Sequence, residues 1–157
     1  MNDNKCLETP NILENIIGKE SCRQRIGEWK SIRFGFGRKI PHSNKAPDPF
    51  YGEWEVGTYS SNWEIYSDNK LLFSSRQNRL SKIELDRQIQ ELCLGSIIKI
   101  ELINDNSDVN IILDNHINIC FYEMRNEEDT EVVHFFAPDN IYIEFHPKNG
   151  WVVETSI

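Results

Sequence analysis

The alternation of apolar and polar residues is clearest in the last third of the chain. Apolar side chains occupy every second position in several short runs, as in Ile98, Ile100 and Leu102. Polar turn sequences such as NDNS (104–107) and PKNG (147–150) separate these runs. A period of two is that of a β-strand with one buried face. The pattern therefore predicts an antiparallel β-meander formed mainly by strands within 97–154.

A helix is predicted over about residues 10–17. Thr9 and Pro10 have the order of an N-cap residue followed by proline at the first helical position. Apolar residues then recur at helical spacing, and Gly18 is placed to end the helix.

A second helix is predicted over residues 82–94. Ser81 and Glu84 have the spacing of a capping box, and Gly95 is a stop signal. Leu85 and Ile89 lie on one face of this helix. We expect both helices to pack on the sheet, because helices this short need a surface to cover.

The middle of the chain adds shorter β-type runs. WEVGTY (54–59), NWEIY (62–66) and LLFSS (71–75) are such runs, and SDNK (67–70) reads as a turn between the last two. The Gly- and Pro-rich stretch 34–50 is interpreted as an irregular loop. A length of 157 residues suits one domain. We therefore expect a single α+β domain, residues 1–157, with an antiparallel meander sheet and two helices packed on it.

Charge changes this picture, because the net charge of −8 is concentrated in the C-terminal third. Residues 101–157 contain twelve acids against two basic residues, Arg125 and Lys148. Such a field repels phosphate backbones and attracts basic surfaces. The densest part is predicted to be a loop between two strands, where it can project toward a partner. The predicted partner-binding residues are Glu123, Glu127, Glu128, Asp129 and Glu131.

Catalytic and metal-binding patterns are weak. The four cysteines form no CxxC pair, so we expect reduced thiols that pack as small apolar residues. Glu144 and His146 would share a strand face near His134, but nothing in their spacing makes three ligands converge on a metal. We therefore expect no enzymatic activity, no cofactor and no metal. The four tryptophans are interpreted mainly as core residues of strands.

The N-terminal sequence MNDNKCLETP is polar and lacks the basic-then-apolar order of a signal peptide. Apolar runs are also too short for a membrane span. The expected location is therefore the cytoplasm, without membrane attachment.

In layout, residues 50–157 resemble the immunity proteins of bacterial contact-dependent and polymorphic toxin systems. The resemblance rests on EWEVGTYSSNWEIY (53–66), on a capped helix ending LCLG (92–95) and on the run of short hairpins. It implies a protein that binds and neutralises a cognate toxin, often a basic nuclease domain, by steric and electrostatic occlusion.

The alternative is a nucleic-acid-linked or small-ligand-binding module. Its binding segment would be the basic, aromatic stretch 29–45, which includes Trp29, Arg33, Phe34 and Phe36. The acidic C-terminal third argues against nucleic acid unless the two surfaces lie well apart. One exposed stripe of Arg33, Arg38 and Lys39 with aromatic side chains would favour this alternative.

Overall fold

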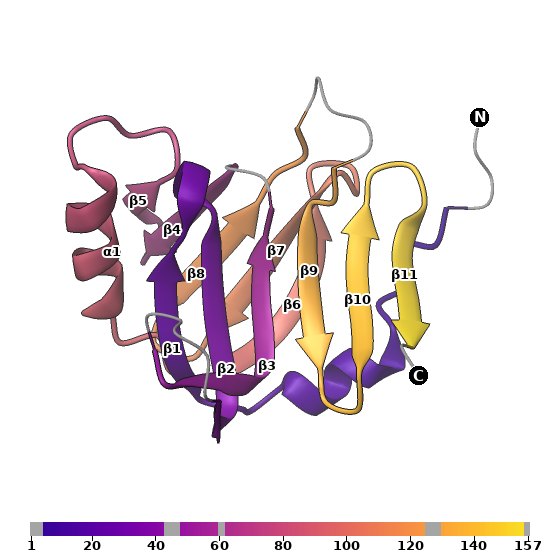
Figure 1. Ribbon diagram of the computed structural model, residues 1–157. Coiled ribbons are helices and arrows are strands. Elements are labelled where there is room, and N and C mark those ends of the chain that lie inside the picture. Colours follow the sequence, from indigo (N-terminus) through magenta and orange to yellow (C-terminus); the bar gives the residue numbers. More distant parts are fainter. Residues whose placement is uncertain (1–4, 43–47, 60–61, 125–129, 156–157) are drawn as a thin grey trace.

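Two antiparallel sheets stacked face to face form the body of the protein (Figure 1). The computed structural model describes residues 5–42, 48–59, 62–124 and 130–155. The six-stranded sheet has the order β1 (Ser21–Ile26), β2 (Ile32–Pro41), β3 (Phe50–Thr58), β9 (Val133–Ala137), β10 (Ile141–His146) and β11 (Gly150–Thr155). The five-stranded sheet has the order β5 (Lys70–Ser74), β4 (Trp63–Ser67), β8 (Ile117–Phe121), β7 (Asp108–Leu113) and β6 (Ile97–Ile103).

The core lies between the two sheets and forms one continuous cluster. From the six-stranded sheet it takes large side chains such as Phe34 and Phe135, and from the five-stranded sheet Trp63, Ile65 and Phe121. All five are at most 1% exposed. Each strand therefore turns alternate residues inward, as a strand with one buried face must.

The antiparallel arrangement of the predicted meander is confirmed, but the prediction of one sheet within 97–154 is wrong. β6, β7 and β8 belong to one sheet, whereas β9, β10 and β11 belong to the other. The chain changes sheets between Phe121 and Val133. Alternation shows which residues of a strand are buried, and it carries no information on which sheet the strand joins.

The N-terminal strands complete both sheets, including a part of the chain interpreted as irregular. β2 covers Ile32–Pro41, so much of the predicted loop 34–50 is strand. Its pairing with β3 shifts register between Phe36 and Lys39, where Gly37 has a φ of 86°. The bulge accounts for Gly37, one of the glycines that made the local sequence resemble a loop.

The one α-helix among the described residues, α1 (Lys82–Gln90), begins as predicted and ends earlier than residue 94. The Ser81 hydroxyl accepts a hydrogen bond from the Glu84 backbone N–H at 3.2 Å. The helix lies beside the edge strand β1, where the Gln24 side chain donates to the carbonyls of Ile89 and Leu92 at 2.6 and 2.8 Å. The helix thus covers the β1 edge of the six-stranded sheet.

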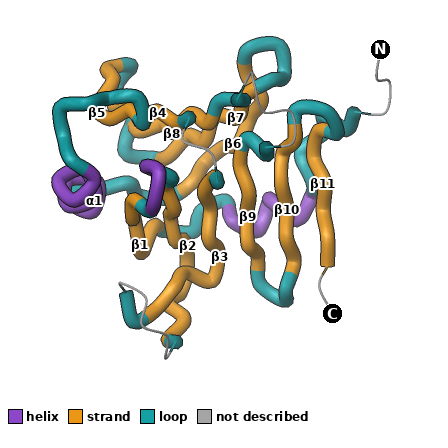
Figure 2. Tube along the Cα trace, turned by 45° about the horizontal axis from the view of Figure 1, so that its top comes forward, coloured by secondary structure: helices purple, strands orange, loops and turns teal. Residues whose placement is uncertain are grey.

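The N-terminal helix is a 3₁₀ helix, η1 (Asn11–Ile16), rather than an α-helix. Pro10 occupies the N-cap position, and no side chain caps the helix, so the prediction of Thr9 as the cap is wrong. Figure 2 shows η1 behind β9–β11, where Leu13 and Ile16 enter the core. A second 3₁₀ turn, η2 (Glu28–Lys30), joins β1 to β2.

The predicted turn at residues 67–70 is confirmed as a two-residue hairpin loop. Ser67 pairs with Lys70, and both central residues have positive φ, 49° at Asp68 and 68° at Asn69. This is the sign that a type I′ turn requires, and Asp and Asn tolerate it better than most residues.

No helix in the described part of the chain has the length and apolar character needed to cross a bilayer.

Two adjacent phenylalanines test which side of β9 faces the core. Phe135 is 0% exposed between the sheets, whereas Phe136 lies on the opposite side of the strand. We expect Phe135→Ala to lower the free energy of unfolding by about 3–5 kcal/mol. Phe136→Ala should cost less than half as much in urea denaturation. Equal losses would show that the assignment of faces is wrong.

Candidate functional site

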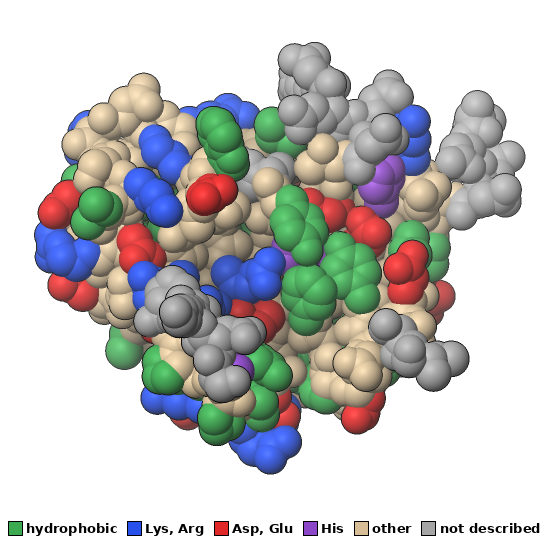
Figure 3. Space-filling model, in the orientation of Figure 1, with side chains coloured by type: hydrophobic (Ala, Val, Ile, Leu, Met, Phe, Trp, Pro, Cys, Tyr) green, Lys and Arg blue, Asp and Glu red, His purple; other side chains and the backbone are tan. Residues whose placement is uncertain are grey.

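The outer face of the six-stranded sheet carries an ordered set of polar and aromatic side chains, which we call the front face. The pairing of the strands arranges them in two rows that cross the sheet. The first row is Arg25, Arg33, Gly57, His134, Glu144 and Val152; the second is Arg23, Gly35, Glu55, Phe136, Tyr142 and Glu154. Figure 3 shows hydrophobic side chains gathered on this face beside a cationic one, with acidic side chains around them.

Each row contains a glycine that lies between an arginine on one neighbouring strand and the residue that this arginine contacts on the other. Arg23 pairs with Gly35, which pairs with Glu55, and the Arg23 Nη1 atom lies 2.7 Å from the Glu55 carboxylate. A Cβ atom on Gly35 would lie 2.5 Å from a Glu55 carboxylate oxygen. In the first row, Gly57 lies between Arg33 and His134, and a Cβ atom there would meet the Ile32 carbonyl oxygen. The missing side chain of Gly35 therefore leaves room for a contact that skips one strand.

Glu131, His134 and Arg33 form a buried polar chain. The His134 Nδ1 atom lies 2.7 Å from a Glu131 carboxylate oxygen, and its Nε2 atom lies 3.2 Å from Nη2 of Arg33. A guanidinium can only donate, so Nε2 accepts and Nδ1 carries the proton that it donates to Glu131. This assignment makes the imidazole neutral. Burial lowers the pKa of His134, Glu131 opposes the shift and Arg33 adds to it.

Aromatic rings cover this chain and form the exposed part of the front face. The ring of Tyr59 lies 4.3 Å from that of His134, and the rings of Phe136 and Tyr142 lie 5.2 Å apart. The Arg33 guanidinium lies 5.2 Å from the centre of the Phe136 ring, within the range of a cation–π contact. We call Tyr59, Phe136 and Tyr142 the aromatic group. Tyr59 is 62% exposed, so a partner can contact it directly.

Carboxylates flank the aromatic group on the side of β10 and β11. Glu144 lies opposite His134, and Glu154 lies opposite Tyr142. Partial burial raises the pKa of Glu144, and the negative charges of Glu131 and Glu154 raise it further. The cost of these like charges would be relieved by a cation placed against them. This half of the front face is therefore both aromatic and acidic.

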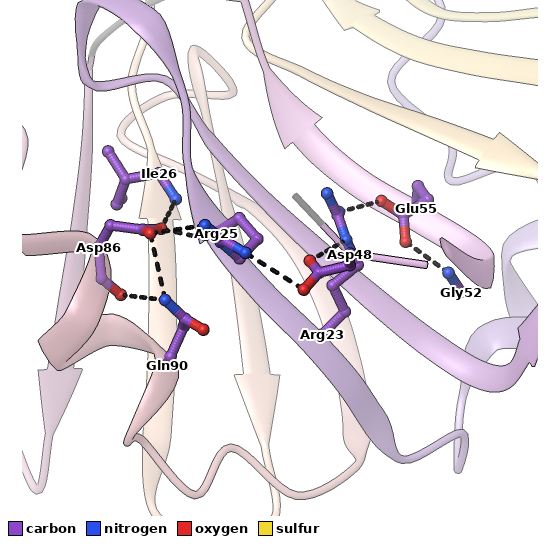
Figure 4. A network of polar contacts seen from close by, with 8 residues as sticks. All are labelled: Arg23, Arg25, Ile26, Asp48, Gly52, Glu55, Asp86 and Gln90. Carbon is purple, nitrogen blue, oxygen red and sulfur yellow. Dashed lines mark hydrogen bonds and ion pairs between the residues drawn. The ribbon is translucent and has the colours of Figure 1, made fainter. Parts of the chain in front are cut away.

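The other half of the front face is held by a charge network (Figure 4). Arg23 bridges Glu55 and Asp48, and Arg25 bridges Asp48 and Asp86 of α1. Asp86 also accepts the backbone N–H of Ile26 at 2.7 Å. Burial raises the pKa of Glu55, while Arg23 and the Gly52 N–H oppose that shift. These charges are paired with one another, so this half mainly fixes α1 against the sheet.

The predicted acidic loop is only partly described. Glu127, Glu128 and Asp129 lie outside the described residues. Glu123 is half-buried, and its backbone N–H donates to Asp108 at 2.8 Å. The prediction required Glu131 to project toward solvent. Glu131 is instead 6% exposed, and its carboxylate contacts His134. Of the two predicted residues that the structure describes, Glu131 supports the front face from behind His134.

Sequence reasoning missed the role of His134. The only local signal was the spacing of three residues between Glu131 and His134, and the third member, Arg33, is distant in sequence. His134 does lie beside Glu144, as expected from neighbouring strands. Among the described residues no group of three or more His, Cys, Asp or Glu side chains is placed to hold a metal ion. The four cysteines are free thiols.

The basic, aromatic segment 29–45 does not form one exposed stripe in its described part. Phe34 and Phe36 are 1% exposed in the core and are not available to stack on bases. Arg33 lies on the front face against His134, whereas Arg38 is paired with Glu53.

Comparisons with family models, with curated proteins and with solved structures find no match to this chain.

The Gly35 bridge can be tested by a double-mutant cycle. Gly35→Ala places a methyl group against the Glu55 carboxylate, and we expect it to lower the free energy of unfolding by about 1–3 kcal/mol. In a Glu55→Ala background the same change should cost clearly less, because the clash is removed. Equal costs in the two backgrounds, measured by urea denaturation, would contradict the bridge.

His134 should make stability depend on pH. Its folded pKa is lowered, so on acidification the unfolded chain takes up the proton first, near the ordinary pKa of about 6.5. The contribution is therefore complete above that pKa and is lost as the pH falls toward the folded pKa. We expect the wild type to lose more stability between roughly pH 7.5 and roughly pH 5.5 than His134→Gln does.

Glu55 and Glu144, whose raised pKa values act in the opposite direction, are common to the wild type and His134→Gln and cancel in the comparison. Parallel curves for wild type and His134→Gln would contradict a buried neutral imidazole.

Proposed function

We propose that this protein is a non-enzymatic inhibitor, of the immunity-protein type, that binds a basic partner protein through the aromatic and acidic half of the front face. The observation that carries the proposal is the aromatic group, which is presented on a sheet and flanked by carboxylates. Tyrosine and phenylalanine at the centre of a polar rim are typical of protein interfaces.

Rigidity supports a binding role for this surface. The ring of Tyr59 lies on His134, which Glu131 and Arg33 hold from both ring nitrogens. The backbone N–H of Tyr59 also lies 3.3 Å from a Glu131 carboxylate oxygen. Side chains that are already ordered lose little conformational entropy when a partner binds.

Charge supports a basic partner. Glu144 and Glu154 flank the aromatic group, and the like charges that raise the pKa of Glu144 would be compensated by a partner's Arg or Lys. A nuclease toxin domain has such cations on its substrate-binding surface. Covering that surface would exclude the nucleic acid, and the inhibitor would need neither turnover nor a cofactor.

The geometry of His134 favours binding over catalysis. A general base needs a ring nitrogen that can reach a substrate proton. In this chain Nδ1 is directed to Glu131 and Nε2 to Arg33, so both nitrogens are engaged within the protein. The carboxylate–imidazole pair therefore supports Arg33 and Tyr59 rather than a reaction.

The proposal is tested with the protein encoded directly upstream of this chain's gene, here called the upstream product. It is expressed in a bacterial host alone and together with this chain. We expect the upstream product alone to stop growth and co-expression to restore it. Restoration should fail for the Tyr142→Ala variant carrying Glu144→Lys. A harmless upstream product, or toxicity that this chain does not relieve, would overturn the proposed function.

Association kinetics separate steering from anchoring. Glu154→Lys should slow association with the upstream product and flatten its salt dependence, because Glu154 is an exposed charge at the rim. Tyr142→Ala should mainly speed dissociation, by about tenfold or more. The matched control is Glu101→Lys on the five-stranded sheet, which should change neither rate. If Glu127→Lys with Glu128→Lys slows association and Glu154→Lys does not, steering belongs to the loop predicted from sequence.

A further inference from the structure

A groove of about 370 Å³ lies between α1 and the edge strand β5. Figure 1 shows both elements at the same side of the sandwich, beside β1. Four apolar residues line the groove, and we call it the β5 groove: Leu71, Leu72, Phe73 and Leu80. From α1 the lining includes Gln88. Clefts that bind ligands have volumes of roughly 300–1,000 Å³, so this groove can hold side chains of a partner.

The floor of the β5 groove belongs to the core, and its rim is exposed. Phe73 and Leu80 are partly buried and pack against the core cluster. Leu71 is 52% exposed and Leu72 is 37% exposed. An apolar side chain placed in the groove would therefore remove apolar surface from water at both the floor and the rim, which is favourable.

β5 also presents an open strand edge at this groove. It is the outermost strand of its sheet, and among the described residues it pairs with β4 alone. The backbone N–H and C=O groups on its outer side can therefore pair with a further strand. Its register with β4 shifts between Ile65 and Tyr66, which leaves Leu72 as an extra residue. Because such a bulge bends the edge, an added strand can follow β5 only over a few residues.

The sequence around the β5 groove is basic, although the chain has a net charge of −8. Residues 69–83 contain four Lys or Arg residues and no Asp or Glu. All four side chains are exposed: Lys70, Arg76, Arg79 and Lys82. Arg79 is itself one of the residues that line the groove. The charge of this segment therefore favours an acidic partner.

Carboxylates of the chain leave these four charges uncompensated. Within the described ranges, none of the four cations takes part in an ion pair. The acids that border the segment contact other residues. Asp68 lies 3.7 Å from Nδ1 of His116, and Glu84 pairs with Arg87 at 2.6 Å. The positive charge at the β5 groove thus remains available to a partner.

We propose that the β5 groove binds a short extended segment of an acidic protein, which adds to β5 as a further strand. The backbone of the segment pairs with the open edge, and its alternate apolar side chains enter the groove. Its Asp or Glu side chains meet Arg79 and the neighbouring cations. Main-chain hydrogen bonds supply affinity and the groove supplies specificity, as in other cases of strand addition.

This surface is separate from the aromatic group. It belongs to the other sheet and takes a partner of the opposite charge, so the inference does not rest on the proposed function. A basic and apolar surface can also bind an anionic membrane. The shape favours a peptide, because a bilayer laid across the groove would leave its floor at Phe73 and Leu80 without contact.

The probe is a short synthetic peptide of alternating valine and glutamate, labelled with fluorescein. We expect it to bind the full chain in fluorescence anisotropy and to slow amide hydrogen exchange within β5, measured by NMR. The same peptide with a central proline should bind about tenfold more weakly or worse, because proline lacks the N–H that strand addition uses. A peptide of alternating valine and lysine should show no binding.

A matched pair of double variants locates the site. Leu71→Glu with Arg79→Glu should weaken binding of the probe by about tenfold or more, because apolar surface is lost and like charges face the peptide. The control is Ile98→Glu with Lys99→Glu on β6, the opposite edge strand of the same sheet. Ile98 is 54% exposed and the Lys99 side chain 63%, so both pairs change one exposed apolar residue and one exposed cation. The control pair should bind as the wild type does, and urea denaturation checks that both variants fold.

Each other outcome would overturn the proposal. No binding of the probe to the wild type up to about 1 mM would exclude the site. Equal losses in the two double variants would show that the peptide does not select the β5 groove. Equal binding of the proline peptide would exclude strand addition. Binding to phosphatidylglycerol vesicles that is lost in the β5 variant, without binding of the peptide, would assign the surface to an anionic membrane instead.

Discussion

Burial of every second side chain between the two sheets determines where all other residues of the strands can lie. Phe135 contributes to the core at 0% exposure, so its neighbours His134 and Phe136 must face outward. A fully buried phenylalanine contributes about 1.5–3 kcal/mol relative to an exposed one, and twenty buried residues of the two sheets share this core. A slip of one residue would exchange the core with the front face, so the same packing that stabilises the fold also fixes the register of the site.

The front face also depends on two glycines, which have no side chain to place on it. Gly35 and Gly57 lie in the middle of strands, where glycine is normally unfavourable. Gly35 lets Arg23 reach Glu55, and Gly57 lies between Arg33 and His134, which are also in contact. Because both contacts cross a strand, they connect β1 and β2 to β3 and β9 through side chains as well as through the backbone. This explains how a sheet face can contain a histidine with no exposed surface and still carry exposed rings above it.

Features that depend on a few neighbouring residues could be predicted from the sequence. The turn at Asp68–Asn69, the cap at Ser81 and the alternation within 97–154 all follow from local stereochemistry. The pairing of β3 with β9 and the change of sheet after Phe121 could not be predicted, because alternation is the same in either sheet. Trp29 was expected in the core with the other tryptophans, but it lies in the turn η2 and is 85% exposed, which no local pattern indicates.

The pairing of β3 with β9 also affects how the chain folds during synthesis. The partners of Glu55, Val56 and Gly57 are synthesised about eighty residues after them. These partners are Phe136, Phe135 and His134 of β9. Until then, any sheet formed by β1, β2 and β3 has an open β3 edge and an apolar face that the C-terminal strands do not yet extend. Open edges and uncovered apolar faces are what chaperones bind and what causes newly made chains to associate. The late closure of one strand pair therefore makes translation of the final third the step on which safe folding of the nascent protein depends.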